Sequence, residues 1–108
     1  MSYNVLTITP FDKQIKRLAR KYPSLKSEFA ALISSLEEQP IQGKAMANNC
    51  FKIRMAIKSK GKGKSGGARV IIHLQVSENT VFLLSIYDKS EQPDITDKEI
   101  NYLLQFIN

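Results

Sequence analysis

Apolar side chains recur with a helical period in two stretches near the start of the chain, after a short strand-like segment at 3–9. From Phe11, apolar residues follow four, seven and eleven positions later, which places them on one face of a helix. Pro23 ends this helix, and a second helix with similar spacing is expected at 25–38. Because only a short corner separates them, the two stretches predict a helical hairpin.

Three later segments, at 51–57, 69–76 and 80–88, alternate in the way that strands with one buried face do. The pattern is cleanest in 51–57, where every second residue is apolar and the intervening Lys52 and Arg54 point the other way. This strand therefore has one apolar face and one cationic face.

The order of these elements predicts a single α+β domain spanning 1–108. An N-terminal strand and the helical hairpin come first, and a mainly antiparallel sheet follows. A capping box at Thr96 then introduces a short amphipathic C-terminal helix. We expect helices to cover one face of the sheet, while the other face stays open and carries the basic residues.

The composition is that of an ordinary globular protein, with 43% hydrophobic and 24% charged residues, and it excludes collagen, coiled coils and wholesale disorder. The longest apolar runs are far shorter than the ~20 residues of a membrane span, and the first residues lack the layout of a signal peptide. We therefore expect no membrane partner. Cys50 is the only cysteine, so a cysteine zinc cage is excluded and a reducing cytoplasm is the expected location.

The net charge of +6 is concentrated in one part of the chain. The stretch 39–77 holds eight Lys and Arg residues and no Asp or Glu, whereas the remainder holds eight basic and ten acidic residues, a net charge of −2. A block of one sign favours a polyanionic partner. The alternative is a surface that serves only solubility.

Four basic residues are expected to converge if the strands pair in sequence order. Lys52 and Arg54 lie on the polar side of the first central strand, Arg69 on that of the next, and Lys89 at the end of the third. Such a cluster could grip a nucleic-acid backbone or stabilise charge on phosphorus during phosphoryl transfer. The alternative is that these are the solvated polar residues of a half-exposed sheet.

The segment 59–67 is rich in glycine and lysine and is expected to be a flexible loop. It does not meet the requirements of a nucleotide-binding phosphate loop, because Lys58 stands where that pattern needs glycine and a strand follows instead of a helix. We expect Lys58, Lys60, Lys62 and Lys64 to form a cationic arm that binds RNA. A merely solvated connection is the alternative.

Two other residues have both a chemical and a structural interpretation, and a third, Cys50, has only a structural one. His73, the only histidine, could shuttle protons, but a packed, satisfied imidazole is the commoner outcome on a strand. Tyr87 could stack on a base and contribute to RNA binding, or it could pack at the edge of the hydrophobic core. Cys50 is interpreted as structural.

The basic block holds no carboxylates, which metal-dependent nucleases need around a divalent ion. We therefore expect neither a metal nor another cofactor. RNA permits cleavage without metal because its own 2′-hydroxyl is an internal nucleophile. A lysine beside other cations has a lowered pKa and could act as the base.

Three short motifs resemble the RelE/ParE superfamily of bacterial toxins. They are Cys50-Phe51-Lys52-Ile53-Arg54-Met55, Gly67-Ala68-Arg69-Val70-Ile71-Ile72 and Ser85-Ile86-Tyr87-Asp88-Lys89-Ser90. The resemblance covers nearly the whole chain and implies the toxin of a type II toxin–antitoxin system. For the RelE branch, it implies an endoribonuclease that enters the ribosomal A site, cuts bound mRNA and inhibits translation, leaving a 2′,3′-cyclic phosphate.

The resemblance also implies roles for individual residues and partners for the protein. Lys52 or Arg54 would lie near the attacking hydroxyl, Arg69 on the phosphate and Lys89 near the leaving group. The partners would be a neutralising antitoxin, the ribosome and mRNA. The segment 90–95 lacks the tyrosine that RelE has after its last basic site residue.

Two alternatives stay open from the sequence. One is a gyrase inhibitor of the ParE type, which has no nuclease activity. The other is a plain RNA-binding module or a toxin that has lost its activity. The four basic positions favour the RelE branch.

Overall fold

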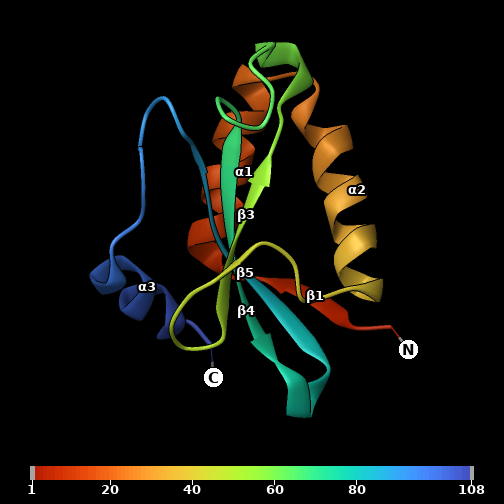
Figure 1. Cartoon of the computed structure of the whole chain (residues 1–108), viewed down its shortest axis with the longest axis vertical. Coiled ribbons are helices and arrows are strands. Elements are labelled where there is room, and N and C mark those ends of the chain that lie inside the picture. Colours follow the sequence, from red (N-terminus) through yellow and green to blue (C-terminus); the bar gives the residue numbers. More distant parts are fainter. Residues whose placement is uncertain (1, 108) are drawn as a thin grey trace.

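The computed structural model describes residues 2–107 and has one five-stranded sheet with three α-helices (Figure 1). The sheet order is β1-β5-β4-β3-β2, with β1 parallel to β5 and all other neighbours antiparallel. The predicted α+β fold is therefore confirmed. The elements are β1 (Asn4–Thr7), α1 (Thr9–Lys21), α2 (Leu25–Glu38), β2 (Lys44–Ala45), β3 (Cys50–Met55), η1 (Lys58–Lys60), β4 (Ala68–Gln75), η2 (Val76–Glu78), β5 (Thr80–Asp88) and α3 (Asp97–Leu104).

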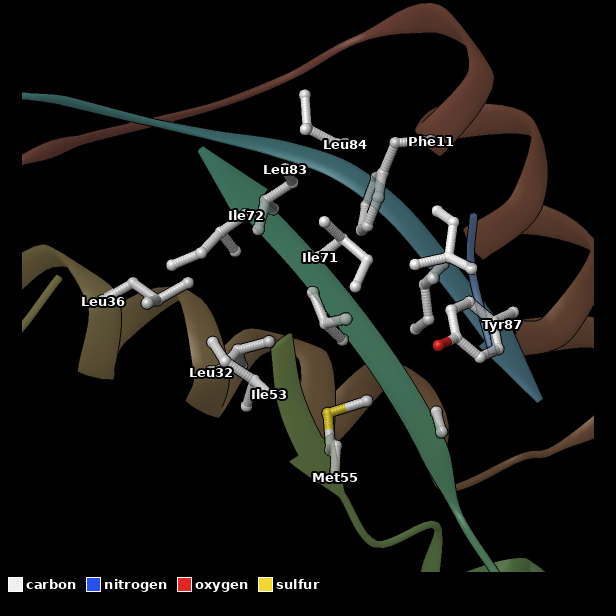
Figure 2. Close-up of a cluster of buried hydrophobic side chains, with 14 of the residues drawn as sticks. Phe11, Leu32, Leu36, Ile53, Met55, Ile71, Ile72, Leu83, Leu84 and Tyr87 are labelled. Atoms are coloured by element: carbon white, nitrogen blue, oxygen red, sulfur yellow. The ribbon is translucent and has the colours of Figure 1, made fainter. Parts of the chain in front are cut away.

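The apolar face of the sheet packs against α1 and α2. Figure 2 shows Leu32 and Leu36 of α2 lying beside Ile53 of β3 and Ile72 of β4, and all four side chains are buried. Phe11 of α1 is fully buried as well. The spacing that predicted each helix from the sequence therefore marks the side chains that form the core.

The opposite face is less open than the sequence suggested. Ile71, Ser85 and Tyr87 share the side of the sheet that carries Arg69, yet all three are buried. The reason is α3, which packs against β5 and lies on the other side of the strands from α2 (Figure 1). Its Ile100 and Leu103 belong to the core. The expectation of a fully open face is therefore wrong, and only the part of that face toward β3 and β2 can carry an exposed site.

Two glycines allow other segments to approach β3 closely. Gly43, just before the short strand β2, has a φ of 85°, and a Cβ there would lie 2.2 Å from the carbonyl oxygen of Lys52. A Cβ on Gly67, just before β4, would lie 2.1 Å from the carbonyl oxygen of Met55. Neither position has room for a side chain. The strand β2 lies between α2 and β3, in a segment for which the sequence pattern predicted no helix or strand.

Candidate active site

The strand register brings the predicted basic residues to one place. Arg54 of β3 lies opposite Arg69 of β4, and Arg69 lies opposite Tyr87 of β5. Residues directly opposite each other on antiparallel strands project their side chains from the same face. Lys89 follows β5, and its backbone N–H donates to the carbonyl oxygen of Gly67, 3.0 Å away, which keeps Lys89 at the same end of the sheet.

All four predicted catalytic residues line a single pocket of about 860 Å³. Six of its lining residues are cationic. None of the lining residues within 2–107 has a carboxylate side chain. The lining residues are Gln42, Gly43, Lys44, Lys52, Ile53, Arg54, Lys64, Ser65, Arg69 and Lys89. The convergence expected from alternation is therefore present, and its chemistry suits an anionic ligand.

Lys44 is a pocket residue that the sequence reasoning did not single out. It lies in β2, directly opposite Lys52 on the neighbouring antiparallel strand β3. The available signal was its membership of the acid-free block 39–77. The two-residue strand that places it beside Lys52 is too short to show an alternating pattern.

Among the pocket cations within residues 2–107, Arg69 makes the most side-chain hydrogen bonds. Its side chain donates to the carbonyl oxygens of Lys64 at 2.9 Å, Ala68 at 3.1 Å and Ser65 at 3.4 Å, and the residue is only 4% exposed. Because no carboxylate takes part in these contacts, the guanidinium keeps its charge available while its position is fixed. A charge held in a partly dehydrated place acts more strongly on a bound anion than one in water.

Lys52 has a carboxylate partner just outside the lining residues. Its Nζ lies 2.7 Å from Oδ1 of Asp94, which belongs to the segment between β5 and α3. The hydrogen bond from Lys52 is the main reason that the pKa of Asp94 lies below its usual value, so this carboxylate is ionised at neutral pH. Nothing in the sequence pattern links these two residues.

The four lysines predicted to bind RNA are placed differently from one another. Lys64 lines the pocket, and Lys58 and Lys62 are exposed. Lys60 is not free to act as part of a mobile arm, because its Nζ lies 2.5 Å from Oδ1 of the buried Asp88 and bonds to Ser90 Oγ as well. Its side chain is only 9% exposed. An RNA contact by Lys60 would require this ion pair to break.

Asp88 is the centre of a buried polar cluster that no sequence pattern predicted. Besides Lys60, the hydroxyl of Tyr22 and the backbone N–H of Ser90 donate to its carboxylate. Burial by itself would raise the pKa of Asp88, but the hydrogen bonds from Lys60, Tyr22 and Ser90 outweigh it and hold the pKa well below its usual range. The cluster joins the end of α1, the turn η1 and the end of β5 beside the pocket.

Tyr87 lies beneath the surface. It is 4% exposed, and within residues 2–107 its hydroxyl has no hydrogen-bond partner. Burial, together with the negative charge of Asp94, raises its pKa to about 12. Its ring is therefore covered in this conformation, which does not favour the stacking role that the sequence allowed.

His73 and Cys50 form a separate contact on the same sheet. The Nδ1 of His73 donates to the carbonyl oxygen of Asn48 at 2.8 Å and lies 3.7 Å from the Sγ of Cys50. Neither residue lines the pocket. These contacts fit the structural interpretation of both residues, as packed side chains whose polar atoms have hydrogen-bond partners. Within residues 2–107, no group of three or more His, Cys, Asp or Glu side chains is arranged to hold a metal ion.

We expect the thiol of Cys50 to be unreactive in the folded protein. The residue is fully buried, and burial raises its pKa to about 11, so little thiolate exists at pH 8. Iodoacetamide at pH 8, followed by mass spectrometry, should label the unfolded chain rapidly and the native protein very slowly. Equal rates in the two states would contradict this burial.

The family model of the RelE toxin of the RelE/RelB toxin–antitoxin system matches residues 11–107. The chain belongs to the RelE toxin family. It is thus a toxin of the toxin–antitoxin class, as the sequence motifs had suggested.

None of the helices within residues 2–107 has the length and apolar composition needed to cross a bilayer.

Solved structures of the RelE family share the fold at low sequence identity. A free E. coli RelE mutant with two arginines changed to alanine has a TM-score of 0.65 and 15% identity, over 100% of both chains. A RelBE toxin–antitoxin complex from Mycobacterium tuberculosis gives 0.62 and 17%, over 82% of this chain and 92% of that one. The intact E. coli RelBE complex gives 0.61 and 16%, over 81% and 96%.

Proposed function

We propose that this RelE-family toxin is a ribosome-dependent mRNA endoribonuclease that works without a metal ion and inhibits translation. The observation that supports this most directly is the pocket itself. Among residues 2–107, it gathers six cations from β2, β3, β4 and the adjoining loops, and none of these lining residues is a carboxylate. Such a pocket is complementary to a phosphodiester and to the additional charge that develops on it during cleavage.

The proposed reaction is an internal transesterification. The 2′-oxygen of the ribose attacks the adjacent phosphorus while the bond from phosphorus to the 5′-oxygen of the next nucleotide breaks. The proton of the 2′-hydroxyl passes to a base, and an acid supplies a proton to the leaving 5′-oxygen. The products are a 2′,3′-cyclic phosphate and a 5′-hydroxyl. No water is consumed and no metal takes part.

The placement of the pocket residues fits a division of roles across the phosphate. Arg69, fixed by three carbonyl oxygens, would hold the charge of the phosphorane. Lys52 or Arg54 on β3 would lie near the attacking hydroxyl, and Lys89 at the end of β5 near the leaving oxygen. Because these cations line one pocket, we assign the base and the acid to the cluster and not to single residues.

A cognate antitoxin is the proposed protein partner. The E. coli and Mycobacterium tuberculosis relatives form complexes with their antitoxins. An acidic segment of such an antitoxin would complement the pocket and compete with RNA for it. The ribosome would present the mRNA, and exposed Lys58 and Lys62 would add contacts to RNA. Because ribosomes and mRNA are the proposed targets, we propose the cytoplasm as the location of this activity.

The test is to incubate the protein with programmed ribosomes and to map the ends of the mRNA. We expect new 5′ ends that polynucleotide kinase labels without prior phosphatase treatment, because transesterification leaves a 5′-hydroxyl. Ends that carry a 5′-phosphate would contradict the mechanism, since they indicate attack by water. Uncut mRNA combined with inhibition of gyrase supercoiling would replace this proposal with the ParE-type activity.

A further inference from the structure

The ion pair between Lys52 and Asp94 is a contact that the proposed reaction does not use. Lys52 is the pocket cation for which the structure, over residues 2–107, shows a carboxylate within 4.0 Å. A carboxylate at this place occupies the same lysine that a phosphate oxygen would need. We propose that Asp94 is an internal counter-ion that competes with an RNA phosphate for Lys52, so that RNA binding requires this ion pair to open.

Asp94 is held beside Lys52 by the backbone of its own neighbour, Ile95. Its Oδ1 accepts the backbone N–H of Ile95 at 2.8 Å in addition to the ammonium of Lys52. Ile95 is buried in the core, so it anchors the turn that carries Asp94. The carboxylate therefore lies at Lys52 without the loss of freedom that an unanchored surface side chain would suffer.

A ligand can displace Asp94 from the ion pair with Lys52, because the pair is exposed. The side chain of Asp94 is 65% exposed, whereas that of Lys52 is 21% exposed. Water and salt screen a carboxylate this exposed, so the pair is weak compared with a buried one. An RNA phosphate in the pocket would also contact Arg69 and Arg54, whereas Asp94 pairs with Lys52 alone. These additional contacts allow the phosphate to replace Asp94 on Lys52.

The hydroxyl of Tyr87 lies within reach of the charge of the same carboxylate, Asp94. It is buried and lacks a hydrogen-bond partner within residues 2–107, although buried hydroxyls in folded proteins nearly always have one. Tyr87 lies opposite Arg69 in the sheet, and the charge of Asp94 acts on its hydroxyl. Movement of Asp94 away from Lys52 would therefore also change the electrostatic surroundings of this hydroxyl.

Asp94→Asn is the appropriate variant, because an asparagine oxygen can still accept the N–H of Ile95 while the negative charge is lost. The matched control is Glu38→Gln, which removes the same charge from an exposed position at the end of α2. The probe is a fluorescent, single-stranded 2′-O-methyl RNA oligonucleotide, which cannot be cleaved through a 2′-hydroxyl. Its binding is measured by fluorescence anisotropy over a range of salt concentrations.

We expect Asp94→Asn to bind this probe about two- to fivefold more tightly than the wild type at low salt, as the loss of an exposed ion pair implies. The slope of log K against log salt should steepen by about 0.7, the value for one more phosphate contact to a single strand. Glu38→Gln should leave the slope unchanged. In a Lys52→Met background, Asp94→Asn should bring no gain, because the competition acts through Lys52.

Equal affinities of Asp94→Asn and Glu38→Gln would overturn the inference, as would a gain that persists without Lys52 or an absence of binding by every variant. The inference rests on the proposed use of this pocket for RNA, but its test is separate from the cleavage assay. Cleavage by the wild type together with equal affinities would remove only the role of Asp94. A gain specific to Asp94 without any cleavage would remove only the ribonuclease activity.

Discussion

Arg69→Ala is expected to lower the rate of mRNA cleavage on programmed ribosomes by about 10²- to 10³-fold, the usual loss when a preorganised charge-stabilising group is removed. The guanidinium lies in the pocket, and three backbone carbonyl oxygens fix its position. It therefore needs no reorganisation when charge develops on the phosphate. The measurement is the single-turnover rate with saturating toxin, which separates the chemical step from binding.

Two further variants separate charge from position. Arg69→Lys keeps a positive charge but loses the planar fork that reaches several carbonyl oxygens at once, so its rate should fall between those of the wild type and Arg69→Ala. Arg20→Ala removes an exposed cation from α1 and should leave the rate within about twofold, since surface changes away from a site have small effects. A folded Arg69→Ala protein that retained a near wild-type rate would exclude Arg69 from the chemistry.

The part of the site that lies on strands could be predicted from the sequence. Alternation is a local property, so it revealed that Lys52 and Arg54 point away from the core. Short connections then favoured sequential antiparallel pairing, and this is the register that places Arg54 opposite Arg69. The gathering of these cations with Lys89 follows from those two regularities.

The parts that the sequence did not reveal depend on contacts between distant segments. Lys60 looked like one member of a lysine-rich loop, but Asp88, 28 residues further on, holds it in a buried ion pair. Lys52 and Asp94 are 42 positions apart. No periodicity relates such partners, because their meeting depends on how η1 and the segment before α3 pack onto the finished sheet. The same packing of α3 explains why Tyr87 is covered.

These contacts have a common physical basis in the high positive charge of the molecule. Cations brought together in one pocket repel one another, and that repulsion opposes folding. The chain fixes Arg69 with carbonyl oxygens and leaves Asp94 at Lys52. It binds Lys60 to Asp88 on the loop that leads to the pocket residues Lys64 and Ser65. Anchoring of this loop by Asp88 therefore supports the pocket, and Asp88 itself is not one of the lining residues.

Asp88→Asn should accordingly destabilise the fold by about 3–5 kcal/mol, the range for breaking one side of a buried ion pair. The carboxylate is fully buried, and its loss leaves the ammonium of Lys60 without a counter-charge. This is a large share of the ~5–15 kcal/mol stability of a typical domain. The measurement is urea unfolding at pH 7, with Glu38→Gln as a surface control that should change the free energy of unfolding by less than about 0.5 kcal/mol.

The dependence on pH gives this prediction a second readout. The folded-state pKa of Asp88 lies below its unfolded value of about 3.9, so the stability due to its charge is complete above that pH and is lost as the pH falls toward the folded pKa. The difference between the wild type and Asp88→Asn should therefore be constant near neutrality and shrink below about pH 4. Addition of Lys60→Met to Asp88→Asn should restore part of the lost stability, because the unpaired charge is removed. A single variant as stable as the wild type, or a difference that does not change in acid, would show that this ion pair does not hold the loop.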